Sequence, residues 1–159
     1  MVSKNLISAE EKLIQNILFS TNFNECNFTN INFDRFVVIG SSHLILPTLF
    51  HNIKKKKISK QFPKDLLAYL DKIYTINHNR NAKLIQEIKY IENLFKKNDI
   101  KHIFLKGSNL LRINKFETGE RMIGDIDILI NKSQSYETID LLNSKGFKNS
   151  FNYRYWKSN

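Results

Sequence analysis

The 159-residue sequence is poor in several residue types, and each shortage excludes a class of protein. Its single cysteine, Cys26, excludes an internal disulfide and a cysteine-rich zinc site. No segment reaches the run of about 18 consecutive apolar residues that a membrane-spanning helix needs. The first residues lack the apolar stretch of a signal peptide and include acidic residues instead. We therefore expect a soluble cytoplasmic protein with no membrane partner.

Arginine is also scarce, although the chain is strongly basic. The net charge is +10, from 25 Lys+Arg against 15 Asp+Glu, but only five of these cations are arginines. Arginine binds phosphate and guanine bidentately, so its scarcity disfavours a nucleic-acid-binding protein. The lysines accompany many asparagines and isoleucines, which is typical of AT-rich coding sequences. The charge suits an anionic substrate such as a nucleoside triphosphate. The lysine run 54–57 is interpreted as a solvated loop.

Glycine and proline are rare in the first part of the chain, where the apolar residues recur at helical spacing. Ser8 and Glu11 fit a capping box ahead of a first helix. Asp34 is predicted to cap a second helix that ends near Gly40. Pro47 suits the first turns of a third helix, or else kinks it.

Residues 63–97 contain no glycine or proline after Pro63, and their apolar positions predict one long helix or two stacked ones. A continuous helix would be about 50 Å long at 1.5 Å per residue. The polar segment Asn77–Asn81 interrupts the apolar pattern. We interpret it as a break in an exposed turn, and the alternative is a polar strip that faces a cleft.

The pattern changes after Asp99, where short apolar runs alternate with glycine-containing turns. Three strands and two helices are predicted here, the strands over 100–105, 125–130 and 147–156 and the helices over 109–113 and 133–144. The fold class is therefore α+β. We expect a helical N-terminal region over 1–98 and a small mixed β-sheet flanked by helices over 99–159.

Two aspartates, Asp125 and Asp127, alternate with hydrophobic residues on the second predicted strand. Side chains two apart on a strand leave the same face, with their Cα atoms about 6.5–7 Å apart. Like charges so close need a compensating cation, and magnesium prefers such oxygen ligands. The pair thus predicts a magnesium site for phosphoryl chemistry. The alternative is a sheet edge with both acids in water.

The tetrapeptide Leu105–Ser108 places Gly107 and Ser108 where the first predicted strand turns into a helix. Glycine allows close backbone approach, and the free amides of a helix N-terminus together with a serine hydroxyl form a phosphate cradle. The alternative is an ordinary turn. If the two strands are neighbours, one pocket would hold both a triphosphate and its metal.

These residues resemble a known family. Gly107-Ser108, sixteen intervening residues and Asp125-Ile-Asp-Ile128 are similar to the signature of the polymerase-beta-like nucleotidyltransferases. The wider string resembles the bacterial family known as uncharacterised nucleotidyltransferases. It consists of Ile103-Phe-Leu-Lys-Gly107, Arg121, Gly124-Asp-Ile-Asp-Ile-Leu129 and Lys145-Gly-Phe147. This resemblance spans nearly the whole chain.

The resemblance implies a role for each matching residue. Asp125 and Asp127 would ligate Mg²⁺, while Gly107 and Ser108 would bind the β- and γ-phosphates of a nucleoside triphosphate such as ATP. Arg121 would neutralise phosphate charge, or else form a salt bridge that orients the aspartate loop. Lys106 would reach a phosphate, or else be solvated. The implied reaction transfers a nucleotidyl group to an acceptor hydroxyl of unidentified type.

One departure from the superfamily pattern is the third carboxylate, which normally lies on a later strand. No Asp or Glu follows Asp140 in this sequence. We therefore expect the chain to be an N-terminal piece of the pattern. The alternative function is a catalytically inactive nucleotide-binding or protein-interaction module, either antitoxin-like or a regulatory fragment.

Overall fold

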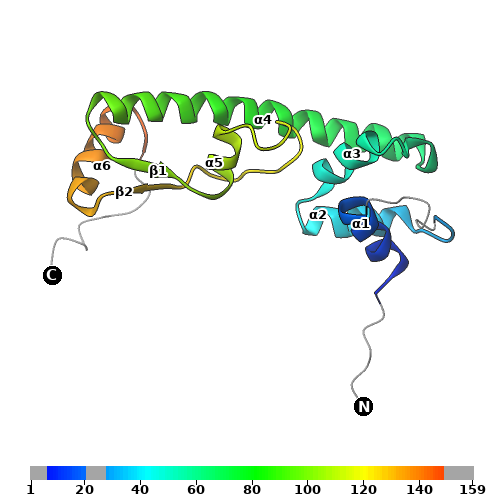
Figure 1. The fold of residues 1–159 in the computed structure, drawn as a ribbon. Coiled ribbons are helices and arrows are strands. Elements are labelled where there is room, and N and C mark those ends of the chain that lie inside the picture. The colour runs from blue at the N-terminus through cyan, green and yellow to red at the C-terminus, as the bar shows by residue number, and fades with distance from the viewer. Residues whose placement is uncertain (1–6, 21–27, 149–159) are drawn as a thin grey trace, which may run out of the picture.

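A computed structural model describes residues 7–20 and 28–148 of the chain (Figure 1). In chain order its larger elements are α1 (Ala9–Phe19), α2 (Phe33–Ser42), α3 (Leu46–Lys55), α4 (Lys64–Lys97), β1 (His102–Phe104), α5 (Lys106–Arg112), β2 (Ile128–Ile130) and α6 (Ser135–Ser144). Short 3₁₀ turns, η2 (Ser59–Gln61) and η3 (Lys132–Gln134), precede α4 and α6. The α+β class predicted from the sequence is confirmed.

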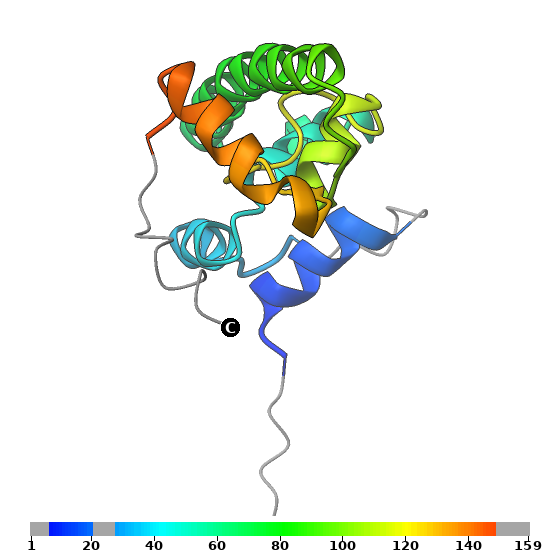
Figure 2. The ribbon, with the colours of Figure 1, turned by 90° about the vertical axis from the view of Figure 1, so that its left-hand side faces the viewer.

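Helix α4 runs the length of the molecule, with α1–α3 under one end and the sheet, α5 and α6 under the other (Figure 1). Figure 2 looks from the end that carries the sheet and shows α6 beside α4. Two apolar clusters fill the interior. The first includes Ile17, Phe36, Leu49 and Leu70, and the second includes Ile88, Phe95, Phe104, Leu111 and Ile123. Helix α4 contributes side chains to both clusters.

Side chains cap the starts of α1 and α2, whereas α3 begins with a proline in its first turn. Ser8 and Glu11 form the expected capping box, with Glu11 N–H donating to Ser8 Oγ at 3.2 Å. Pro47 lies in the first turn of α3, as predicted. The prediction for α2 was wrong, because Asn32 caps it by accepting from Arg35 N–H at 3.0 Å. Asp34 instead lies in the first turn of α2, where a carboxylate suits the helix dipole.

Helix α2 continues past Gly40 to Ser42. Gly40 is buried, and a Cβ there would lie 2.6 Å from Leu46 Cδ2, so the absence of a side chain lets α2 approach α3 closely. The glycine at this position therefore serves packing rather than termination.

The lysine run 54–57 is not a fully solvated loop. Lys54 and Lys55 form the last turn of α3, and the Lys56 ammonium donates to the backbone oxygens of Ile17 at 2.6 Å and Ser20 at 2.8 Å. The last carbonyls of a helix lack intrahelical partners and attract a cation. Lys56 thus closes the C-terminal end of α1, and the interpretation of the whole run as solvated was wrong.

Helix α4 is continuous over 34 residues, so the predicted break at Asn77–Asn81 was wrong. Asn77 and Asn81 are buried at 3% and 0% exposure, whereas His78 and Asn79 between them are exposed. The segment is therefore a helical surface with one polar side that faces the protein. This arrangement is close to the alternative prediction for Asn77–Asn81, which was a polar strip that faces a cleft.

The sheet consists of β1 and β2, which pair antiparallel with Ile103 opposite Leu129 and Phe104 opposite Ile128. Both strands are shorter than predicted. The second begins at Ile128, so Asp125 and Asp127 precede the strand and are not part of it. The predicted third strand lies almost wholly outside the described residues. Helix α6 ends as expected ahead of Gly146, whose φ of +90° suits glycine.

Among the described residues, no single helix is both long and apolar enough to cross a membrane. Helices α2 and α3 reach that length and composition only as a pair, which bends by 120°.

Candidate functional site

The turn after β1 and the segment before β2 lie side by side, as the site prediction required. Leu105 N–H donates to the backbone oxygen of Asp127 at 2.9 Å, which extends the strand pairing by one residue. The Ser108 hydroxyl donates to the Leu105 oxygen at 2.6 Å and lies 3.2 Å from the Asp127 oxygen. The Leu105–Ser108 turn and Asp127 are therefore adjacent in space.

Ser108 is 1% exposed, and its hydroxyl is directed at the backbone oxygens of Leu105 in the turn and of Asp127. It joins the two chain segments in this structure. The backbone N–H groups of Lys106, Gly107 and Ser108 lie in the first turn of α5, where no intrahelical acceptor is available to them. These backbone amides, rather than the Ser108 hydroxyl, are the donors of the turn that are available to an anion.

Gly107 is required by packing against the segment that leads to the aspartates. A Cβ at this position would lie 2.6 Å from Ile123 Cδ1 and 3.4 Å from Ile123 Cγ2. Ile123 is itself buried in the second apolar cluster. The glycine thus lets α5 lie against the chain just before Asp125.

The two aspartates differ in their surroundings. The Asp127 side chain is 28% exposed and pairs with Lys106, whose Nζ lies 3.3 Å from Asp127 Oδ1. Asp125 is exposed, and among the described residues its carboxylate makes no hydrogen bond or ion pair. The Asp127 carboxylate is therefore already paired with the Lys106 ammonium, whereas the Asp125 carboxylate is available to a ligand.

Side chains of α3 and α4 hold the loop that leads to the aspartates, and we call these four residues the carbonyl clamp: Thr48, Asn77, Arg80 and Asn81. All four donate to backbone oxygens of residues 118–124. The Asn77 amide donates to Gly119 at 2.8 Å and Arg121 at 3.1 Å, and the Asn81 amide to Thr118 at 2.6 Å and Arg121 at 2.8 Å. Thr48 donates to Glu120 at 2.8 Å and Arg80 to Gly124 at 3.1 Å.

The clamp fixes the backbone of Arg121 while leaving its side chain in solvent. The Arg121 oxygen accepts from both asparagines, and the residue is exposed. Within the described part of the chain, its guanidinium forms no ion pair with Asp125 or Asp127. The orientation of the aspartate loop thus comes from the clamp, and the Arg121 side chain projects from a fixed backbone position.

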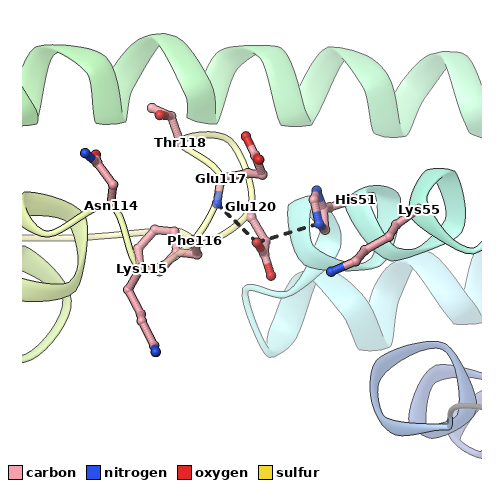
Figure 3. A pocket seen from close by; sticks show the side chains of 8 residues that line it. All are labelled: His51, Lys55, Asn114, Lys115, Phe116, Glu117, Thr118 and Glu120. Atoms are coloured by element: carbon pink, nitrogen blue, oxygen red, sulfur yellow. Dashed lines mark hydrogen bonds and ion pairs between the residues drawn. The ribbon is translucent and has the colours of Figure 1, made fainter.

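A cavity of about 650 Å³ opens between α3 and the part of the loop that contains Glu120 (Figure 3). His51 Nε2 lies 3.7 Å from Glu120 Oε2, which also accepts from Glu117 N–H at 3.3 Å. The other residues that line the cavity are Lys55, Asn114, Lys115, Phe116 and Thr118. Nearby, the pKa of Tyr74 is raised by burial and by the carboxylates of Glu117 and Glu120.

The donor set fits magnesium delivered together with a nucleotide. Over the described residues, no three His, Cys, Asp or Glu side chains converge as a metal site. Asp125 and Asp127, two residues apart just ahead of β2, offer two carboxylates. Magnesium is commonly held by one or two carboxylates, substrate phosphates and water, so two carboxylates beside free backbone amides match that pattern.

The fold and this arrangement define an α+β protein in which the Leu105–Ser108 turn adjoins Asp127 of an acidic pair. A family model described as "Uncharacterised nucleotidyltransferase" matches residues 29–158, and the chain belongs to this family. The membership indicates nucleotidyl transfer in general, with a nucleoside triphosphate as substrate. No curated protein and no solved structure matches the chain.

The carbonyl clamp is the part of the site that the sequence analysis missed. One signal was present, because Asn77 occupies a position of the apolar helical spacing where a hydrophobic residue is expected. Asn81 follows four residues later and so lies on the same helix face. Two buried asparagines at that spacing indicate a helix that binds backbone rather than a helix that breaks.

Proposed function

We propose that the protein is a magnesium-dependent nucleotidyltransferase that moves a nucleoside monophosphate from a nucleoside triphosphate to an acceptor hydroxyl. The observation that carries this proposal is the hydrogen bond from Leu105 N–H to the Asp127 oxygen, which joins the turn to the acidic pair. Family membership supports the same reaction class.

In this proposal Asp125 and Asp127 hold the metal, which neutralises phosphate charge when it is bound. The backbone amides of Gly107 and Ser108 receive the β- and γ-phosphates, since they lack intrahelical acceptors. The exposed Arg121 guanidinium adds a further phosphate contact from its clamped backbone. The Ser108 hydroxyl holds the turn against Asp127 so that amides and carboxylates keep their relative positions.

The transfer forms one bond and breaks one. The acceptor oxygen bonds to the α-phosphorus, the bond from that phosphorus to the bridging oxygen breaks, and pyrophosphate leaves with its electron pair. The hydroxyl proton goes to a base. That base is a water molecule, because both carboxylates of the site are assigned to the metal.

A second candidate is nucleotide binding without turnover. It is favoured by one observation, namely that no third acidic or metal-binding side chain joins the pair among the described residues. Such a protein would bind the magnesium nucleotide complex through the same residues. It would then act on a partner protein rather than on an acceptor hydroxyl.

Isothermal titration with ATP, GTP, CTP and UTP, each with excess Mg²⁺, tests the shared part of both candidates. We expect binding that Asp125→Asn and Asp127→Asn each weaken at least about tenfold, because a charged ligand is lost. Asp71→Asn, at an exposed position of α4, is the matched control. Binding that is equal in all four proteins would contradict the site. Pyrophosphate release then separates the transferase from the binding module.

A further inference from the structure

Lys106 occupies a strained position at the edge of the site. It is the first residue of α5, and its φ of +48° lies in the left-handed region that favours glycine. Its side chain is 73% exposed, yet its Nζ lies 3.3 Å from Asp127 Oδ1. The residue thus combines an unfavourable backbone conformation with an ion pair to a proposed metal ligand.

The ammonium of Lys106 and a magnesium ion require the same oxygen. Among the described residues, Lys106 is the only cation within ion-pair distance of Asp127. A metal that binds Asp127 through Oδ1 must displace Nζ from it. The displaced ammonium remains beside the turn, because Lys106 directly precedes Gly107 and Ser108, whose amides are proposed to receive the phosphates.

We propose that Lys106 exchanges partners during substrate binding, and this inference rests on the proposed function. In the free protein Lys106 pairs with Asp127 and opposes binding of the bare metal ion. When the metal arrives with a nucleoside triphosphate, Lys106 releases Asp127 and binds a phosphate oxygen. The exchange makes metal and nucleotide binding cooperative, since each ligand removes an obstacle to the other.

The expected sizes follow from the exposure of the ion pair. Exposed ion pairs are weak, so removing the ammonium should strengthen binding of the bare metal by about twofold to fivefold. A charge-assisted hydrogen bond to phosphate is stronger, so the same change should weaken nucleotide binding by about tenfold. One substitution is thus expected to move the two affinities in opposite directions.

The test uses the full chain and two substitutions, Lys106→Met and Lys106→Gly. Methionine keeps much of the side-chain length without the charge, and glycine suits the left-handed backbone. Lys101→Met is the control, because Lys101 is also exposed and lies at the opposite end of β1. Mn²⁺ binding without nucleotide is measured by electron paramagnetic resonance of the free ion. Binding of the four nucleoside triphosphates with excess Mg²⁺ is measured by titration calorimetry.

We expect both Lys106 variants to bind Mn²⁺ more tightly and the nucleotides more weakly than the unmodified protein and Lys101→Met. Equal or weaker Mn²⁺ binding in both variants would overturn the exchange while leaving the proposed function intact. Unchanged nucleotide binding would overturn the phosphate contact. If the unmodified protein binds neither Mn²⁺ nor any nucleotide, the proposed function and this inference fall together.

Discussion

The carbonyl clamp makes a sharp prediction for Asn81, which is fully buried on α4. Its amide group donates to the oxygens of Thr118 and Arg121, and its Oδ1 has no partner among the described residues. Only the donor half of the side chain therefore holds the loop. Asn81→Ala removes both donors and leaves the Thr118 oxygen without that partner, whereas Arg121 keeps its bond from Asn77.

The cost follows from the two lost hydrogen bonds and the newly unsatisfied oxygen. Each hydrogen bond contributes about 1 kcal/mol, and an unsatisfied buried group costs about 1–3 kcal/mol, so Asn81→Ala should destabilise by about 3–5 kcal/mol. The higher helix propensity of alanine offsets about 0.5 kcal/mol of this. At this chain length each 1 kcal/mol changes Tm by about 2–4 °C, so Tm should fall by at least about 4 °C.

Urea and thermal unfolding followed by circular dichroism measure this effect, with Asn79→Ala as the control. Asn79 has the same chemistry and the same helix but is exposed, so its replacement should be neutral or slightly stabilising. Asn81→Asp should be worse than Asn81→Ala, because a carboxylate would face backbone oxygens. Equal stabilities of Asn81→Ala and Asn79→Ala would refute the clamp.

Two further predictions concern packing and pH. Gly107→Ala should destabilise by about 1–2 kcal/mol in chemical denaturation, because its Cβ would meet Ile123, whereas Gly124→Ala, where no atom lies within 4 Å, should change stability by less than about 0.5 kcal/mol. The pKa of Glu10 is lowered from 4.5, chiefly because Asn32 N–H donates to its carboxylate. Its contribution to stability is thus present above pH 4.5 and lost as the pH falls through the lower folded-state pKa, so Glu10→Gln should flatten the acid loss of stability in unfolding curves. A Glu10→Gln profile identical to that of the unmodified protein would contradict this assignment.

The sequence predicted those features that depend on neighbours within a few residues. The Ser8 capping box and the first-turn position of Pro47 are local, and both are confirmed. The adjacency of the turn at Gly107 to the acidic pair was the condition on which the predicted site depended, and the hydrogen bond from Leu105 to Asp127 meets this condition. The sequence did not predict that Asp125 and Asp127 precede the second strand. The pairing between the two strands ends where Leu105 meets Asp127.

The errors have a common physical cause in contacts between distant parts of the chain. Asn77 and Asn81 were read as a helix break because asparagine favours turns, but backbone oxygens about 40 residues later stabilise them inside the helix. Lys56 was interpreted as solvated, yet it closes α1, whose C-cap residue Ser20 lies 36 residues earlier. Local pattern alone contains no information about partners at such separations.

Because α4 is continuous, one helix contributes side chains to both apolar clusters. A fragment that begins at residue 99 would lose Ile88 and Phe95 from its apolar cluster, and one that ends at residue 98 would leave these side chains in water. The donors that orient the aspartate loop would also be separated from it. Cutting the chain at this point would therefore leave two incomplete proteins instead of two working halves.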